Sequence, residues 1–557
     1  MKSSNFRPAG SDSQDSPDEL IADYAGMELD DPPSSQRAKR WCKSRDYRMG
    51  PACLDEIWQW PTDQLEQIAR RGLLGEFTMT LEQGVCLHTS YSGMGVPEQS
   101  AAMLQAAAGS TKPFRVHRAC DFSATCRRIL NSFPRTHRAH YVAKDLLDMV
   151  SIETIAEMQR VLKSAKAEYQ ERRQAGEVKR KFVGELWARV QKDMTDILSQ
   201  LDWSEPKARC DGHDGRPIEH PWWWDGFEVG GTELVGEVAG TVCVAWSSMG
   251  SGSGWLAASC IPFFIWLSLV VHKRPHFIIH ECTPRFEIEI FQKALGTWYD
   301  IQTICLSPTD LGIPASRDRR YTVMLLKTAL APVMKLDSAE FKDMFYRRVA
   351  IPGSVFMDSL QEDDWQAYIK ELASAQRLPE KDVTGPWPLD AVLPAGMATR
   401  RAAWNDWAAQ HGVTTGLCDA NHHASFIGNV LQPVPALLQS SMIHVVSDRV
   451  FHPLEHFGPI GLPVLAKDRI SAGNLGGLIP AELLASMSTR ELKSVTGNAM
   501  HAACVGLMIL YVTSCTEKLE RLRQPRSMPP STKPTHAEEK DDDDRPTVAL
   551  ATESMEV

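Results

Sequence analysis

The sequence lacks several features that would place it in a specialised class. It has no excess of positive charge, since 60 Lys and Arg stand against 70 Asp and Glu for a net charge of -10, so the whole chain is not a basic nucleic-acid binder. Its first twenty residues are polar and contain no apolar stretch, so no signal peptide is visible. Its 13 cysteines are scattered, which excludes a disulfide scaffold and favours a reducing, intracellular compartment.

The sequence also lacks a clear membrane span and a standard metal site. The longest uncharged run, Trp255–Val271, is shorter than the roughly 20 residues of a spanning helix and contains Pro262. We therefore expect a buried helix there and no contact with a membrane. Cys210, His213 and His220 have a spacing that fits no standard zinc site. We expect no bound metal.

The sequence does have a strand–helix rhythm. With 43% hydrophobic and 23% charged residues, the composition is globular, and 557 residues allow two or more domains. From Gly84, apolar alternating runs are followed by glycine turns and helix-forming segments, which predicts an α/β fold with a parallel, doubly wound sheet. The predicted strands are GVCLHTSY, FRVHRACD, HYVAKD, ELVGEVAGTVCVAW, PHFIIHECTP, WYDIQTICL and YTVMLLK.

Residues 151–200 interrupt this rhythm with a helical insertion that is rich in Lys and Arg. The segment shows no obvious apolar stripe, so we expect it to bury little and to be removable without unfolding the protein. A solvated charged face explains its composition best, and contact with phosphates is the alternative.

Three successive strand ends carry residues that suit a nucleoside cofactor. A glycine turn, which includes Tyr91, Ser92, Gly93 and Gly95, follows the first strand and opens a helix, where backbone can approach a ligand closely. Asp121 ends the second strand, where an acid can bind ribose hydroxyls. Asp145 ends the third and is placed to hold an exocyclic amine. Each acid taken alone is more often a helix cap.

The fourth and fifth strands end in groups that suit covalent catalysis. Cys243 ends a strand that we place beside the first one, so its thiol is expected to face the cofactor. A buried cysteine and an ordinary glycine turn are the structural alternative. Glu281 ends the next strand as a candidate proton donor. Arg317 and Arg319 lie two apart, on one face of an extended segment.

These residues, in this order, resemble the cytosine-5 DNA methyltransferase family. The resemblance runs from about residue 84 to 325 and from about 433 to 512. The matching positions are the aromatic-x-Gly-x-Gly turn Tyr91–Gly95; NSFP at Asn131–Pro134; Cys243 for the Pro-Cys-Gln motif; Glu281 for Glu-Asn-Val; Arg317 and Arg319 for Gln-x-Arg-x-Arg; Arg449, Pro453, Glu455, Gly461 and Pro463 for Arg-x-Leu-x-Pro-x-Glu and Gly-x-Pro; and Gly497 with Asn498 for the last motif.

The resemblance implies a Rossmann-like sheet that binds S-adenosyl-L-methionine, with Tyr91, Ser92, Gly93, Gly95, Asp121, Asp145 and Asn498 as cofactor contacts. It implies that the Cys243 thiolate attacks C6 of a cytosine flipped out of DNA, that Glu281 holds a proton on N3, and that Arg319 contacts the carbonyl oxygen. The loop Ser248–Gly254 would close over the base. A protein that methylates DNA is expected in the nucleus.

The resemblance also implies a domain plan. We expect a disordered tail at residues 1–40, a helical extension at 41–83, and a catalytic domain at 84–325 that contains the 151–200 insertion. A smaller target-recognition domain would follow at 326–445, then the C-terminal part of the catalytic domain at 446–515 and a disordered acidic tail at 516–557.

Three positions depart from the family pattern. Val242 replaces the proline before the thiol, Cys282 the asparagine after the glutamate, and Ala315 the glutamine of the arginine motif. Two alternatives therefore stay open. One is cytosine-5 methylation of tRNA, because the motifs do not separate the two substrates. The other is an inactive, methyltransferase-like protein that binds nucleic acid without turnover.

Overall fold

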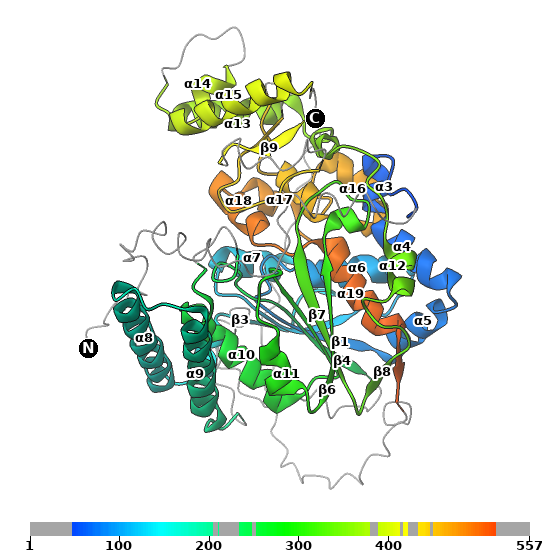
Figure 1. Cartoon of the computed structure of the whole chain (residues 1–557). Helices are drawn as coiled ribbons and strands as arrows, with labels where there is room; N and C mark the ends of the chain where they lie inside the picture. Colours follow the sequence, from blue (N-terminus) through cyan, green and yellow to red (C-terminus); the bar gives the residue numbers. More distant parts are fainter. Residues whose placement is uncertain are drawn as a thin grey trace, which may run out of the picture.

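A seven-stranded sheet forms the centre of the molecule (Figure 1). The computed structural model describes residues 47–203, 210, 233–247, 252–378, 388–412, 416–421, 433–445 and 449–519. The strand order is β3-β2-β1-β4-β5-β7-β6. The strands are β1 (Val85–Ser90), β2 (Arg115–Cys120), β3 (Tyr141–Ala143), β4 (Leu234–Gly240), β5 (Phe277–Cys282), β6 (Tyr299–Leu306) and β7 (Arg319–Leu326).

The sheet is doubly wound, which confirms the predicted fold class. Strands β1 to β5 pair in parallel, and β7 is antiparallel to both β5 and β6. The chain builds β2 and β3 on one side of β1 and then crosses to β4 on the other side. The carboxyl ends of β1 and β4 therefore flank the point where the winding reverses, which is where such sheets bind ligands.

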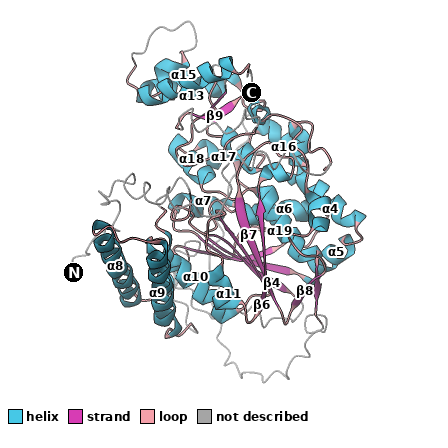
Figure 2. Cartoon of the chain, in the orientation of Figure 1, coloured by secondary structure: helices cyan, strands magenta, loops and turns pink. Residues whose placement is uncertain are grey.

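Helices cover both faces of the sheet (Figure 2). Alternate residues of β5 face opposite ways: Phe277 and Ile279 enter one buried cluster, and Ile278 enters the other. The first cluster includes α4 (Trp60–Arg70), α5 (Leu74–Gln83), α6 (Val96–Ala107) and α19 (Ala502–Ser514). The second includes α8 (Ile152–Gln174), α9 (Arg180–Ser199), α10 (Cys260–Lys273) and α11 (Glu289–Leu295).

The remaining helices and strands are not part of the seven-stranded sheet. They are the helices α3 (Leu54–Trp58), α7 (Ala124–Ser132), α12 (Ala339–Phe345), α13 (Glu362–Ala375), α14 (Leu389–Val392), α15 (Ala395–Gln410), α16 (Ala466–Ala472), α17 (Ala481–Ala485) and α18 (Thr489–Gly497), and the strands β8 (Leu330–Pro332), β9 (Leu417–Asp419), β10 (Ile443–Val445) and β11 (Thr516–Lys518). The region of α13 to α15, at the top of Figure 1, has a small core of its own around Trp365 and Tyr368.

The helical insertion is not the loosely attached hairpin that we expected from its composition. Its helices α8 and α9 do carry an apolar stripe, and the stripe is buried against α10. The buried side chains are Met158, Leu162, Ala165, Tyr169, Val183, Leu186, Val190, Met194 and Leu198. Long charged side chains lie between these apolar positions and obscure the helical periodicity in the sequence. The expectation that the insertion buries little was therefore wrong.

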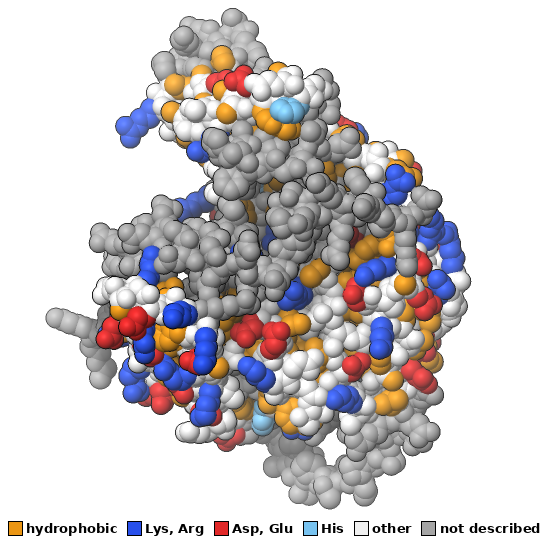
Figure 3. Space-filling model, viewed as in Figure 1, with side chains coloured by type: hydrophobic (Ala, Val, Ile, Leu, Met, Phe, Trp, Pro, Cys, Tyr) orange, Lys and Arg blue, Asp and Glu red, His pale blue; other side chains and the backbone are white. Residues whose placement is uncertain are grey.

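The outer face of the insertion carries charges of both signs (Figure 3). Several of them form ion pairs within the insertion, such as Arg172 with Glu177 at 2.8 Å, and Arg189 with Glu168. A mixed, self-paired surface favours a solvated face over a phosphate-binding one.

The apolar run at Trp255–Val271 forms η5 (Gly254–Leu256) and most of α10, and both elements are buried as expected. One described stretch, Thr489–Ser514, has the length and a mean hydropathy of 1.5 that a membrane span would have, but 94% of its most apolar window is buried within the protein. Such burial is typical of a core helix.

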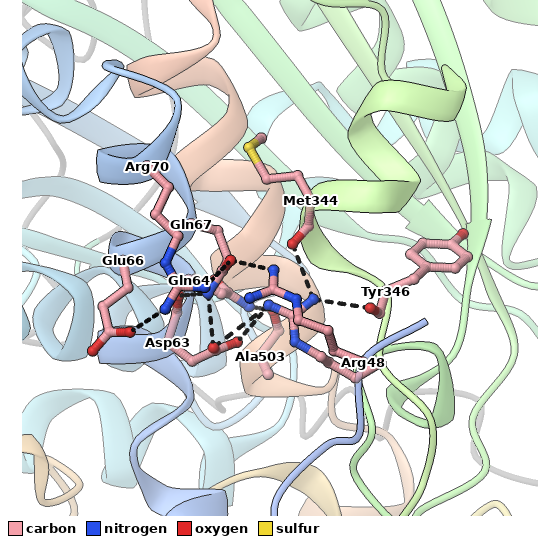
Figure 4. Close-up of polar contacts among 10 residues, drawn as sticks. Arg48, Asp63, Gln64, Glu66, Gln67, Arg70, Met344, Tyr346 and Ala503 are labelled. Atoms are coloured by element: carbon pink, nitrogen blue, oxygen red, sulfur yellow. Dashed lines mark hydrogen bonds and ion pairs between the residues drawn. The ribbon is translucent and has the colours of Figure 1, made fainter. Parts of the chain in front are cut away.

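Both ends of the described chain are tied to the body. At the N-terminal end, Gln64 on α4 donates to the Ala503 carbonyl oxygen on α19 at 3.0 Å, and Arg48 donates to Gln67 (Figure 4). At the C-terminal end, Thr516–Lys518 forms β11 and pairs with β8. The prediction of disorder from residue 516 is therefore wrong for residues 516–518, while residues 1–40 and 520–557 lie outside the described residues.

Candidate active site at the carboxyl edge of the sheet

The predicted glycine turn joins β1 to α6. Tyr91, Gly93 and Gly95 all have left-handed backbone conformations, with φ of 54°, 56° and 78°. A Cβ on Gly95 would lie 2.6 Å from the ring of Phe133, so this glycine brings the turn against the NSFP segment. A Cβ on Gly93 would meet nothing within 4 Å. At Gly95 the turn is therefore packed against Phe133. At Gly93 it faces open space, which a bound cofactor would fit.

Asp121 and Asp145 lie beyond the ends of β2 and β3, as predicted. The Asp121 carboxylate accepts hydrogen bonds from the Gly93 amide at 2.8 Å and from the Ser123 amide at 2.9 Å. It therefore ties the glycine turn to β2, and burial raises its pKa. Asp145 accepts from the Leu147 amide at 3.0 Å and caps the short helix η1 (Leu146–Met149). Burial also raises the pKa of Asp145.

Ser92 completes the connection between the first two strand ends. Its hydroxyl accepts from the Cys120 amide at 2.9 Å, and its own amide donates to the Cys120 carbonyl oxygen at 3.0 Å. The Tyr91 hydroxyl is buried, and burial raises its pKa well above 10. The Ser92 contacts hold the turn against the end of β2.

Cys243 does not end a strand, which corrects one detail of the sequence-based interpretation. Strand β4 stops at Gly240, and Cys243 opens a turn in which the Trp246 amide donates to its carbonyl oxygen at 2.9 Å. Strand β4 does pair with β1, as predicted. The cysteine is half-buried, so its thiol is neither sealed in the core nor fully exposed. The buried-cysteine alternative does not describe this residue.

Glu281 lies one pairing position from the end of β5, beside Gly240 of β4. Its carboxylate forms an ion pair with Arg319, with 2.9 Å between Oε1 and the arginine Nε. Burial lowers the pKa of Arg319, but Glu281 and Cys243 outweigh that effect and raise it. Cys243, Glu281 and Arg319 therefore share one electrostatic site at the carboxyl edge.

Arg317 lies in the same site but makes different contacts from Arg319. Its guanidinium donates to the Leu437 carbonyl oxygen at 3.3 Å and to the Gly497 carbonyl oxygen at 3.4 Å. Burial and the neighbouring Arg319 lower its pKa to about 10. Arg317 thus joins β7 to two distant segments of the chain.

The late motifs also reach this edge. Met500 lies against Gly240, where an added Cβ would be 2.4 Å from the methionine methyl group. Asn498, a predicted cofactor contact, is exposed at the C-terminal end of α18. Farther away, Arg449 pairs with the buried Glu455 at 2.7 Å. Gly461 ends a short helix with φ of 85°. Arg449, Glu455 and Gly461 therefore stabilise the segment of chain that leads back to the sheet.

The structure shows where the three departures from the family pattern lie, and it explains nothing about Val242. Cys282 is buried, with its sulfur 3.9 Å from the Thr241 carbonyl oxygen, and burial raises the pKa of its thiol. It therefore stays protonated and does not compete with Cys243. Ala315 is buried and bridges to Val434. Val242 is half-buried.

Sequence reasoning missed Phe122, which directly follows Asp121. Its side chain is 69% exposed at the carboxyl edge, although large apolar side chains are usually buried. An exposed ring beside a nucleoside-type site is suited to stacking on a base. The available signal was its place one residue after the acid that ends β2. Among the described residues, no cluster of three or more metal-ligating side chains occurs; His213 and His220 lie outside them.

No protein-family model matches the sequence, and no curated protein matches it. Among solved structures, the chain is similar to an Entamoeba histolytica methyltransferase, EhMeth, at 12% identity over 77% of this chain and 98% of that one, with a TM-score of 0.36. It is similar to a putative DNA modification methyltransferase from an E. coli prophage at 12% identity over 78% and 99%, with a TM-score of 0.38. A Spodoptera frugiperda DNMT2 mutant matches at 11% over 77% and 99%, with a TM-score of 0.35. At such low values these likenesses carry no argument about this chain.

Proposed function

We propose that this protein transfers a methyl group to C5 of a cytosine flipped out of DNA, through a covalent adduct with Cys243. The observation that carries the proposal is the Glu281–Arg319 ion pair, which joins β5 to β7, together with Cys243, which follows the neighbouring strand β4 and helps Glu281 to raise the pKa of Arg319. Strand β4 pairs with β1, which leads into the glycine turn, and the winding of the sheet reverses between these two strands.

Each of the three groups has a role in this chemistry. The Cys243 thiolate would add to C6 of the ring, which makes C5 nucleophilic toward the methyl group; a base then removes the C5 proton, the bond to C6 breaks and the thiolate leaves. Glu281 would hold a proton on N3, so that the attack does not place a full negative charge on the ring. Arg319, fixed by its ion pair with Glu281, would donate to the carbonyl oxygen of the base and stabilise the charge that develops there.

The residues around the turn are consistent with S-adenosyl-L-methionine, which supplies the methyl group when bound. Gly93 faces open space, Asp121 lies beside it, and the exposed Phe122 ring follows. We propose that the turn and Asp121 hold the nucleoside part of the cofactor and that Phe122 stacks on its base. Asp145 and the exposed Asn498 are retained as proposed contacts.

One experiment tests both which nucleic acid is the substrate and whether the protein is an active enzyme. Duplex DNA and tRNA, each carrying 5-fluorocytosine, are incubated with the full chain and S-adenosyl-L-methionine, and adducts that survive denaturation are counted. We expect an adduct with DNA and none for Cys243→Ala. An adduct with tRNA alone would replace DNA as the substrate. Absence of any adduct from a protein that binds the cofactor would support the inactive alternative. A nuclear location is part of the DNA proposal.

A further inference from the structure

The helical insertion packs against the turn that carries Cys243 through an aromatic side chain, Trp187 on α9. Its ring packs against the ring of Trp246, with 5.5 Å between centroids and 70° between planes. Trp246 closes the turn that carries Cys243, because its amide donates to the Cys243 carbonyl oxygen at 2.9 Å. The insertion therefore contacts the cysteine turn directly, through the Trp187 ring on Trp246.

Trp187 also contacts Gly254, at the far end of the segment that follows the cysteine turn. Gly254, with φ of 52°, lies so close that an added Cβ would be 2.3 Å from the Trp187 ring. The Gly254 amide donates to the Ala245 carbonyl oxygen at 3.0 Å. Both stems of the segment that follows Cys243 therefore rest on one indole ring.

A second contact from α9 supports the same stems. Gln191 donates to the Glu287 carboxylate at 3.0 Å, and the Trp255 indole N–H donates to the same carboxylate oxygen. Trp255 in turn packs on Trp246, with 4.9 Å between ring centroids. The Trp246 ring at the cysteine turn is therefore held by Trp187 of the insertion on one side and by Trp255 and Phe286 on others.

We infer that Trp187 is a positioning residue that sets the place of the Cys243 thiol. This inference rests on the proposed function for its catalytic consequence, but the placement of the thiol can be measured without turnover. A displacement of about 1 Å at a reacting group is enough to cost about a hundredfold in rate. The effect should therefore be large in kcat and small in cofactor binding.

The first measurement needs no activity. Iodoacetamide labels the folded chain, and peptide mass spectrometry follows Cys243 against Cys305, an exposed cysteine on β6 that serves as an internal reference. In Trp187→Ala we expect the ratio of the two labelling rates to change at least threefold. Trp187→Phe, which keeps an aromatic ring, should restore it to within twofold.

The matched control is Phe182→Ala on the same helix. The Phe182 ring packs under Arg172 and belongs to the same apolar cluster, so its loss costs similar packing elsewhere on α9. We expect its labelling ratio to stay within twofold of wild type. If Phe182→Ala and Trp187→Ala change the ratio equally, the role of Trp187 is merely structural and the inference fails. If Trp187→Ala does not fold, Trp187→Leu is tested in the same way.

The second measurement is methyl transfer to DNA. Trp187→Ala should lower kcat at least tenfold and change the KM for S-adenosyl-L-methionine less than threefold, with recovery in Trp187→Phe. An unchanged labelling ratio together with unchanged kcat would overturn the inference. If wild type shows no methyl transfer and no 5-fluorocytosine adduct, the proposed function fails, and the labelling ratio alone still decides the role of Trp187.

Discussion

The two halves of the carboxyl edge are built in different ways. At the ends of β1 to β3, backbone amides meet Asp121 and Ser92, so the glycine turn is held by hydrogen bonds between consecutive strand ends. At the ends of β4 and β5, the turn of Cys243 rests on Trp187 and Trp255 from other parts of the chain. The half with the glycine turn, which is the proposed cofactor half, is held by hydrogen bonds between neighbouring strand ends. The half with Cys243, the thiol half, depends on aromatic packing that includes the insertion.

The largest expected effect separates the two halves completely. Cys243→Ala should abolish methyl transfer and the 5-fluorocytosine adduct, while calorimetry should show S-adenosyl-L-methionine binding within about threefold of wild type. The reason is that the thiol is the proposed nucleophile, whereas the proposed cofactor contacts are the glycine turn and Asp121. Unchanged turnover would contradict the mechanism, and parallel loss of binding would mean that the two halves are not separable.

Removal of the insertion should be nearly as damaging. Replacing Ile152–Leu198 by a short Gly/Ser linker would expose the apolar face of α10, which now packs on buried side chains such as Leu186 and Val190. Each buried aliphatic side chain contributes about 1.5–3 kcal/mol. We expect an aggregated protein by size-exclusion chromatography. A soluble deletion with an unchanged Tm would show that the insertion is dispensable.

Gly95→Val tests the packing of the cofactor turn. The added side chain meets Phe133 and Leu130 and adopts an unfavourable φ, so the turn should move. Cofactor affinity should fall at least tenfold, about 1.4 kcal/mol, and the Tm should fall with it. Binding by calorimetry and thermal unfolding are measured on the same samples. Affinity equal to wild type in a folded variant is the contrary result.

Phe122→Ala tests the open side of the same turn. Because the ring is 69% exposed, its loss should leave the Tm unchanged. If the ring stacks on the cofactor base, affinity for S-adenosyl-L-methionine should fall by about 1 kcal/mol or more. Phe122→Trp, which retains a stacking surface, is the matched control and should bind like wild type. Equal affinities in all three proteins would remove Phe122 from the site.

The last expected effect is the pH dependence of stability from His501, which precedes α19 and acts on stability alone. Burial, and then Arg317, lower its pKa from 6.5 to about 3. Between these values the unfolded chain binds the extra proton, so the free energy of unfolding falls as the pH drops below 6.5, by about 1.4 kcal/mol per pH unit. His501→Phe should reduce the slope of the unfolding free energy against pH by about 1.4 kcal/mol per pH unit. Urea unfolding at pH 7.5, 6.5 and 5.5 measures it, and an identical slope would contradict the assignment.

The sequence predicted more of the cofactor half than of the thiol half. The strand–turn–helix pattern placed Tyr91–Gly95, Asp121 and Asp145 correctly at successive strand ends, because period-two alternation and glycine turns are local signals. It placed Cys243 beside the first strand, but on a strand end rather than in a turn. It also paired Arg317 with Arg319 by spacing, although their hydrogen-bonding and ion-pair partners differ.

By itself, the sequence determined the parallel part of the α/β sheet, the order of its strand ends and the residue types that reach them, since each follows from short-range patterning. It did not predict that β7 runs antiparallel to β5 and β6. Only the tertiary structure decided that the insertion is part of the core and that its Trp187 supports the cysteine turn. These contacts join segments far apart along the chain, and their apolar stripe is interrupted by long charged side chains that snorkel to solvent. No local pattern encodes which distant ring fills the space beneath a turn, because packing is settled by the shape of the whole core.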